Sequence, residues 1–540
     1  MKRLLGLVCL LGLLTVSAVN PLHAALPTVV LSIKSVEEIM EDADFVGESV
    51  GKENLKGTAE ASLDSITNGA GLAGIDEKKP LGLYWDMAIS GADEVGKAVL
   101  FLPVDDPAEF KKLIESLVPD LTEKDGLWSM TVAGMPVFAK ISNDYCFAST
   151  STAALAKPSD PTKIVNLKYD ISVAINVSDI PKDAKAAFLQ TTESEGRKAI
   201  DNGPKPDSDA ELAGQNFGFD MTLATLKAIT NDGDRFTFGV DVNRETKMTS
   251  VDFSLTAKPN STLAKSMAVY GKTTPEFAAV AAESAPFRLI ISHPTSGMAE
   301  QTKPLFDAMR KTADEEIDKD ESLKDAADKK AAKSVATRLF NIAQATINSG
   351  SVHSVIVLEE GEKDTVRIVA GTKLAKGDDA GKLVDDVVKL SKESPDLANV
   401  QLDVAKHAGA RIHAITPDLN EKQDAMFGEG PAHLAIRPDS LWLSIGGGNL
   451  DLLKSALDST GKKSTKVSAP ISLRMKPATL VTLLEDDDEE LIKRAESIAG
   501  QPGDVMNIEI LPIDLTAVKL HLEFGMDLFK LGADSANAEN

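Results

Sequence analysis

Apolar and polar residues alternate with a period of two in several short stretches of the chain. The runs 171–178 and 471–476 both place Ile, Leu, Val or Met at every second position, with mostly small or polar residues between. Strict alternation is typical of a β-strand with one buried apolar face and one wet face. Strands of a doubly wound parallel sheet are apolar on both faces, so this pattern favours antiparallel sheets.

Longer stretches with a helical pattern lie between the strand-like runs. They cover residues 36–67, 182–230, 295–348 and 477–499. Strands and long helices in one chain predict an α+β fold. Within the third stretch, 310–333 is nearly all Asp, Glu, Lys and Ala, which indicates either a solvated helix-hairpin tip or a mobile loop.

The chain also resembles itself. Blocks within 105–157 return in the same order within 378–454, where the second copy carries an insertion. Both copies begin with an Asp pair that can cap a helix, and both contain a strand–Gly turn–strand pattern, at 129–140 and 403–415. We therefore expect two tandem homologous halves, each a mainly antiparallel sheet system covered by helices.

The repeat sets the expected domain boundaries. The first α+β repeat domain covers 25–271, a linker covers 272–285, and the second α+β repeat domain covers 286–530. The polar segment 531–540 is expected to be a disordered tail.

Residues 1–24 are typical of a secretory signal peptide. Lys2 and Arg3 precede an apolar run from Leu4 to Val16, and Ala24 ends a small-residue cleavage pattern. We expect an exported protein, periplasmic or extracellular. No other stretch approaches the roughly 20 apolar residues that cross a bilayer, so the mature chain is expected to have no transmembrane segment and to be soluble.

Composition narrows the possible partners. The 540-residue chain has a formal net charge of −24, which argues against nucleic-acid and membrane-surface partners. Removal of the signal peptide, which contains Cys9, would leave Cys146 as the single cysteine of the mature chain. We therefore expect a buried strand thiol and no internal disulfide.

Two glycine-rich stretches invite a nucleotide-binding interpretation. Gly446, Gly447 and Gly448 stand between a strand-like and a helix-like run, but Asn-Leu-Asp follows them where a phosphate loop has Lys and Ser or Thr. The motif GAGLAG at 69–74 follows a helical stretch and precedes a strand, the reverse of the dinucleotide-binding context. We predict a tight turn at the first and a flexible connector at the second.

The remaining residues with metal or acid–base chemistry form no recognisable site. His407 and His413 flank one predicted hairpin turn and point to opposite faces of it, while His293 is expected in a loop. The acidic run Glu485–Glu490 lacks the spacing of a calcium loop and suits the start of a helix. We predict no catalytic residue, no cofactor and no metal.

Some phrases resemble a class of exported bacterial proteins of unknown function with tandem α+β repeats. The resemblance rests on VLFLPVDDPAEFKKLIESL (99–117) and on GMPVFAK (134–140). It implies export and the repeated fold, and it brings no catalytic residues.

These observations favour an exported envelope protein that acts as a non-catalytic binding or structural module. A first alternative is a periplasmic carrier of an apolar, lipid-like ligand, which requires a large apolar cavity between sheet and helices. A second alternative is a carboxylate-dependent hydrolase, which requires a cleft with two close carboxylates of raised pKa. A protein or an apolar small molecule is the expected partner.

Overall fold

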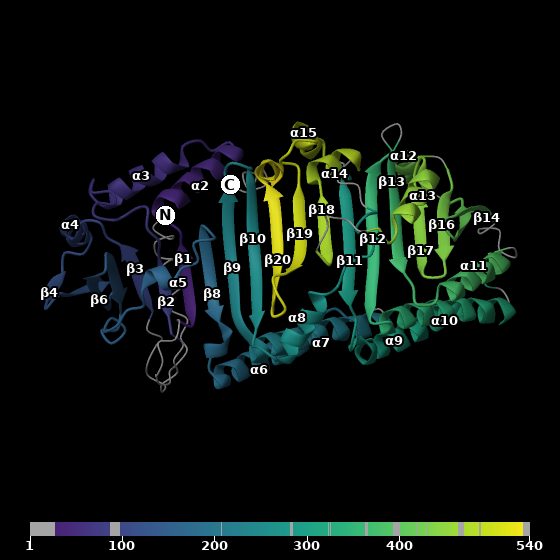
Figure 1. Ribbon diagram of the computed structural model, residues 1–540, viewed down its shortest axis with the longest axis horizontal. Helices are drawn as coiled ribbons and strands as arrows, with labels where there is room; N and C mark the ends of the chain where they lie inside the picture. The colour runs from purple at the N-terminus through teal and green to yellow at the C-terminus, as the bar shows by residue number, and fades with distance from the viewer. Residues whose placement is uncertain are drawn as a thin grey trace. The chain divides into compact units, whose positions relative to one another are not determined.

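The computed structural model describes residues 27–86, 98–206, 208–280, 284–321, 323, 326–361, 365–391, 400–417, 419–428, 430–462, 469–484 and 488–532 (Figure 1). The expected signal peptide and residues 533–540 of the expected tail lie outside this part of the chain. The chain divides into two compact units, which are described separately. Unit 1 comprises the described residues of 1–190, 228–264 and 522–540, and unit 2 those of 191–227 and 265–521.

Ten antiparallel strands build the sheet of unit 1. Along the sheet their order is β4-β5-β6-β7-β3-β2-β1-β8-β9-β10. Their bounds are β1 (Val29–Ile33), β2 (Leu81–Trp85), β3 (Val99–Pro103), β4 (Thr122–Lys124), β5 (Leu127–Val132), β6 (Met135–Ser142), β7 (Tyr145–Ser149), β8 (Ile171–Asn176), β9 (Gly233–Asn243) and β10 (Met248–Ala257).

The strands of unit 2 pair in the order β14-β15-β16-β17-β13-β12-β11-β18-β19 with antiparallel registers, and β20 pairs with β19. Their bounds are β11 (Phe287–Pro294), β12 (Ser351–Glu360), β13 (Val366–Lys373), β14 (Val400–His407), β15 (Ala410–Ile415), β16 (Ala432–Arg437), β17 (Ser440–Ile445), β18 (Ile471–Met475), β19 (Met506–Pro512) and β20 (Ala517–Gly525). Residues 517–521 of β20 belong to unit 2 and residues 522–525 to unit 1. The expected mixed α+β class with antiparallel pairing is confirmed.

Each of the four predicted helical stretches contains two helices. They are α2 (Val36–Ser49) and α3 (Leu55–Ile66), α6 (Lys182–Asn202) and α7 (Asp209–Asp232), α9 (Met298–Lys319) and α10 (Ala326–Asn348), and α14 (Pro477–Leu483) and α15 (Glu489–Ile498). The charged stretch 310–333 spans the end of α9 and the start of α10, so the helix-hairpin interpretation is the correct one. The other helices are α4 (Pro107–Leu117), α5 (Pro161–Ile164), α8 (Thr262–Tyr270), α11 (Gly377–Ser391), α12 (Glu421–Phe427), α13 (Asn449–Ser459), α16 (Phe529–Gly532), and the 3-10 turns η1 (Val177–Asp179) and η3 (Met526–Leu528).

Local sequence accounts for many of these boundaries. Asp106 accepts hydrogen bonds from two N–H groups of the first turn of α4, and Pro107 follows at the first helical position, where its missing N–H costs nothing. Asp488 caps α15 in the same way, so this described end of the acidic run begins a helix as expected. The predicted hairpins form at β5–β6 and β14–β15.

In the core of each unit, a buried aromatic ring packs directly against a strand glycine. In unit 2, Trp442 is fully buried, packs edge-on against Phe277 with 5.1 Å between ring centroids, and lies over Gly371. In unit 1, the ring of Tyr169 lies over Gly239. A Cβ atom at either glycine would lie 2.4 Å from the ring, so the backbone and the ring approach closely only because the side chain is absent.

We expect Gly371→Ala to destabilise unit 2 by about 1–3 kcal/mol, because the added methyl overpacks the contact with Trp442. Alanine is otherwise the better strand residue, so intrinsic propensity predicts the opposite sign. The measurement is thermal unfolding by calorimetry. Gly381→Ala, in α11 and with only one atom near the added methyl, is the control and should leave stability unchanged or raise it.

The structure corrects which face of the alternating strands is buried. In β8, Ile171 is 36% exposed while Ser172 is 1% exposed, and in β18 Ser472 is buried while Ile471 and Leu473 are only half-buried. The prediction that the apolar face faces the core is therefore wrong for these strands. Small residues occupy the covered side because they allow close packing of rings and short hydrogen bonds, such as Ser32 Oγ to Ser172 Oγ at 2.8 Å.

Candidate functional site

The partly exposed apolar face of unit 1 is the first candidate site. Aligned across β1, β8, β9 and β10, every second residue is apolar and lies on this face. The row Leu31–Val173–Phe238–Phe253 is one line of neighbours across the four strands. Phe253 is 36% exposed, and its ring contacts that of Phe238 with centroids 5.1 Å apart.

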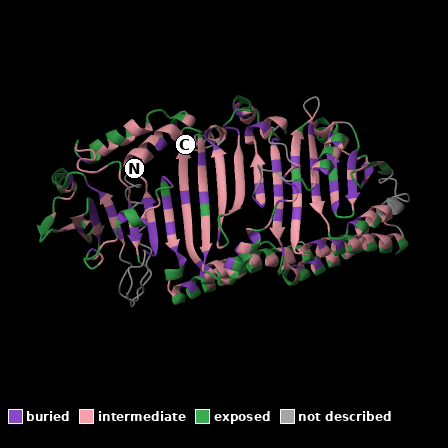
Figure 2. Cartoon of the chain, in the orientation of Figure 1, coloured by how far each residue is buried: buried purple, intermediate pink, exposed green. Residues whose placement is uncertain are grey.

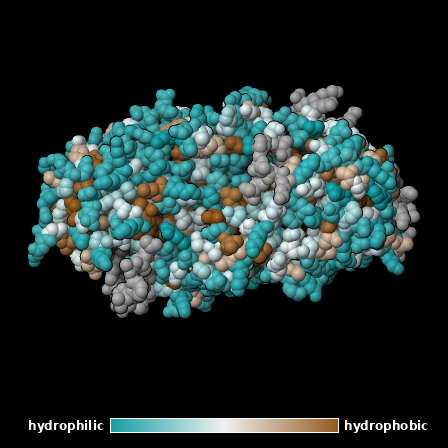
Figure 3. Space-filling model, in the orientation of Figure 1, coloured by the Kyte–Doolittle hydropathy of each residue, from teal (hydrophilic) through white to brown (hydrophobic). Residues whose placement is uncertain are grey.

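This face is only partly buried, whereas residues on the opposite side of the same strands, such as Ser172 and Asp252, are buried. In Figure 2 the long strands β9 and β10 are drawn mainly in the colour of intermediate burial, and in Figure 1 no described helix crosses their middle. Figure 3 shows brown apolar patches within the mainly hydrophilic surface over the strands. Because side chains with no layer above them keep part of their area in water, this face is accessible to a partner.

Unit 2 has a corresponding apolar face of its own. Leu289, Leu473 and Ile508 are neighbours across β11, β18 and β19, and all three are half-buried. Farther along the same sheet, Ile356 and Leu443 are 37% and 45% exposed. The opposite face of these strands holds the core around Trp442.

A cluster of carboxylates in unit 1 is the second candidate site. Glu38 and Asp42 lie one turn apart on α2, and Asp170 directly precedes β8. Carboxylate oxygens of these three residues all lie within 4.8 Å of one another. Lys34 and Arg244 surround them, with Lys34 Nζ 3.0 Å from Glu38 and 3.2 Å from Asp170, and Arg244 Nη1 3.1 Å from Asp42.

The electrostatics of the cluster are dominated by Asp42. Burial first, and then the charge of Asp170, raise the pKa of Asp42 from its usual value to about 7. Hydrogen bonding to Lys34 lowers the pKa of Glu38, which keeps that carboxylate ionised. The hydrolase alternative requires two close carboxylates of raised pKa, and in this cluster the pKa of Asp42 is raised while that of Glu38 is lowered.

The cluster nevertheless lies inside the unit. Asp42 and Asp170 are 5% and 2% exposed, and Asp170 Oδ2 accepts a 2.7 Å hydrogen bond from the backbone N–H of Val242. The carboxylates therefore hold α2 against the strands, and no described pocket leads a substrate to them. Sequence reasoning missed this cluster because its members lie far apart in the chain, and only the Glu38–Asp42 spacing of four residues is a local signal.

The three glycines at 446–448 form a turn, as predicted. Gly446 has a φ of +107°, and a Cβ there would lie 2.3 Å from the carbonyl oxygen of Val366. The following residue, Asn449, begins α13 and connects the turn to the core: it donates to the carbonyls of Pro431 and Gly446 and accepts from Ser444. Its Oδ1 also contacts His433. The side chain of Asn449 thus fills the space enclosed by the glycine turn.

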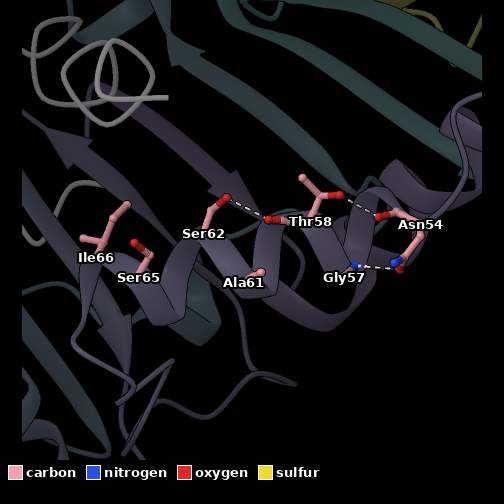
Figure 4. Close-up of a pocket in the computed structure, with 7 residues that line it drawn as sticks. All are labelled: Asn54, Gly57, Thr58, Ala61, Ser62, Ser65 and Ile66. Atoms are coloured by element: carbon pink, nitrogen blue, oxygen red, sulfur yellow. Dashed lines mark hydrogen bonds between the residues drawn. The ribbon is translucent and has the colours of Figure 1, made fainter.

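The motif at 69–74 follows α3 and leads into an isolated bridge at Ile75, as the reversed order predicts. Gly74 lies against the backbone of Phe110 in α4, where a Cβ would meet the amide nitrogen at 2.2 Å. A hollow of about 560 Å³ lies beside α3 (Figure 4). Its lining is one helix face with mostly short side chains, and the hydroxyls of Thr58 and Ser62 donate to carbonyls of the helix turn before them.

The histidines are held by separate neighbours. His407 bonds Asp458 at 2.9 Å, whereas His413 is fully buried and accepts from the N–H of Asp403, so the two rings do not converge on a metal. His293 lies within β11 beside the ring of Tyr270, which corrects its placement in a loop. Burial lowers its pKa.

Both ring nitrogens of His353 in unit 2 lie within hydrogen-bond distance of a serine hydroxyl. Its Nδ1 lies 2.9 Å from Ser292 Oγ and its Nε2 lies 3.0 Å from Ser351 Oγ, while burial lowers its pKa. Glu276 lies 3.8 Å from Nε2 and pairs with Lys373. This arrangement satisfies every polar atom of a buried histidine and thereby stabilises the sheet.

Cys146 lies in β7 and is buried, as predicted. Burial raises the pKa of its thiol to about 12, so the thiol is unreactive at neutral pH.

Among the described helices, none is long and apolar enough to span a bilayer. Comparison with family models, with curated protein sequences and with solved structures finds no match to this chain.

Proposed function

We propose that this chain is an exported, non-catalytic binding module, periplasmic or extracellular, that docks a protein partner on the apolar faces of its sheets. One observation carries the proposal: the apolar rows of the alternating strands are partly exposed, and the small polar rows are buried. Contiguous exposed apolar surface is unusual on a protein without a partner and typically marks an interaction site.

The polar chemistry of the chain supports a non-catalytic role. Asp170 of unit 1 and His353 of unit 2 are bound to neighbours of the fold, at distances typical of structural hydrogen bonds and ion pairs. In these arrangements the side chains orient backbone and helices, and none of them points into a described cleft.

A carrier of an apolar, lipid-like molecule is the second candidate function. The rows across β11, β18 and β19 combine Phe, Leu, Ile and Met with no charged side chain on the same face of these three strands. Such a surface suits an acyl chain as well as a protein side chain.

We also propose that the two units arose by tandem duplication. In support, the two sheets have the same strand order when each strand of unit 1 is matched to the strand ten numbers later. In this correspondence β14–β15 match the edge strands β4–β5. The stretch interpreted from the sequence as an insertion then contains β16, the counterpart of β6.

The test of the proposed function is native mass spectrometry of the mature protein, isolated gently from the cells that make it. A protein partner in fixed stoichiometry supports the docking module, and a small molecule released on denaturation supports the carrier. A bare chain with neither contradicts both functions.

We expect Phe253→Asp to weaken binding of the isolated partner, or of an apolar fluorescent probe, by at least about tenfold, because the charge must be desolvated on docking. The measurement is a titration at constant ionic strength. Ser254→Asp is the matched control, since it places the same charge one residue away on the opposite face of β10. Equal loss in both variants would argue against the apolar face as the binding surface.

A further inference from the structure

Asp42 is a buried acid without hydrogen-bond partners. Its side chain lies in unit 1, and neither carboxylate oxygen has a hydrogen bond among the described residues. Arg244 Nη1 is 3.1 Å away but not aligned as a donor to it. A buried ionised carboxylate in this state is costly, so a ligand is missing at its oxygens.

The charges around Asp42 do not neutralise it. The charged groups around Asp42 and its neighbour Asp170 come from the end of β1, from α2 and from β9 with its following turn, and they are Lys34, Glu38, Glu41, Asp241 and Arg244. The η3–α16 segment beside α2 brings Asp527 and Lys530, which pair with each other at 2.7 Å. Carboxylates therefore outnumber cations in the cluster.

A divalent cation does not fit as the missing ligand. Glu38 already binds Lys34 and Arg244 with its two oxygens, at 3.0 Å and 3.2 Å. Asp170 binds Lys34 with one oxygen and the N–H of Val242 with the other. Only the oxygens of Asp42 remain, far fewer than the six or more that calcium requires.

A proton on the Asp42 carboxyl, in contrast, can supply the interaction that its oxygens lack. We propose that Asp42 and Asp170 share a proton taken from solvent, and that this proton is a latch that holds α2 against strands β8 and β9. In the latched state the Asp42 hydroxyl donates to the Asp170 carboxylate, which remains ionised beside Lys34. Loss of the proton leaves two adjacent buried charges, which water can reach only if α2 moves away.

The direction of the pH dependence follows from linkage. Asp42 has a pKa of about 7 in the folded protein and an ordinary value of 3.8. The stabilisation of α2 is therefore fully present near pH 4 and is lost progressively as the pH rises to about 7, above which it no longer changes. Glu38, whose pKa is lowered, acts in the opposite direction only below its ordinary value of 4.5.

The experiment is hydrogen–deuterium exchange of the full mature chain between pH 5 and pH 8, corrected for the intrinsic rate of amide exchange. Protection of amides in α2 should fall by at least about tenfold between pH 5 and pH 7 and then level off, since one pKa unit corresponds to a tenfold change. Amides of α10 in unit 2 provide an internal reference. In Asp42→Asn, which keeps the shape but cannot ionise, α2 should show no such fall.

Glu41→Gln is the matched control, because Glu41 also binds Arg244 but lies at the exposed edge of the cluster. It should keep the wild-type pH profile. If Asp42→Asn does not fold, Asp170→Asn provides the second test: removing the neighbouring charge should move the fall to lower pH. A wild-type profile without the fall, or an equally steep one in Asp42→Asn, overturns the proposal. The result is independent of the proposed binding function.

Discussion

Replacing Trp442 by Ala is expected to destabilise unit 2 by about 4 kcal/mol, the largest effect that we predict for a single side chain. Trp442 is fully buried at the centre of the unit 2 core, packs on Phe277 and Gly371, and donates its indole N–H to Ser440 at 3.1 Å. Removing the ring leaves a cavity that Gly371 cannot fill, and also leaves the Ser440 hydroxyl without this donor.

Calorimetry should show the unit 2 transition lowered by roughly 10 °C, at about 2–4 °C per kcal/mol for a unit of this size. Leu443→Ala is the matched control because Leu443 lies one residue from Trp442 on the opposite, 45% exposed face of β17. It should change stability by less than about 1 kcal/mol. Similar shifts for the two variants would contradict the difference in burial between the two faces of β17.

Replacing Asn449 by Ala is expected to cost unit 2 about 3 kcal/mol. Asn449 donates to the carbonyls of Pro431 and Gly446 and accepts from Ser444, whose side chain is fully buried. The shorter side chain leaves these buried groups without partners, and each unmatched group costs about 1–3 kcal/mol.

Unfolding in urea measures this effect, and Asn420→Ala provides the comparison. Asn420 caps α12 with exposed hydrogen bonds, so the same substitution there should cost only about 1 kcal/mol. If the variant Asn449→Ala is no less stable than Asn420→Ala, the glycine turn does not depend on its asparagine.

Local patterns in the sequence predict much of the fold. Helical periodicity locates all four helix pairs, and the hairpin at 129–140 forms where a glycine turn separates two alternating runs. The isolated Cys146 is buried as expected. These features depend on residues close together in the chain, so their signal is present in short windows.

The orientation of the strands could not be predicted in the same way. Alternation in 171–178 separates two faces but does not say which face receives the covering layer. In unit 1 the layer lies over the small residues, where Tyr169 packs on Gly239 and Ser32 bonds Ser172. The covering residues come from other parts of the chain, and the carboxylates of the acidic cluster are likewise brought together only by the sheet.

The burial of Cys146 has a practical consequence. Burial raises the pKa of this thiol to about 12, so very little of it is the thiolate at pH 8, the form that reacts with maleimides and methanethiosulfonates. The other cysteine of the sequence, Cys9, lies in the segment that the sequence predicts to be a removable signal peptide. A cysteine introduced on the exposed face of β10 therefore becomes a unique attachment point for a spin label or fluorophore, with the native thiol left in place.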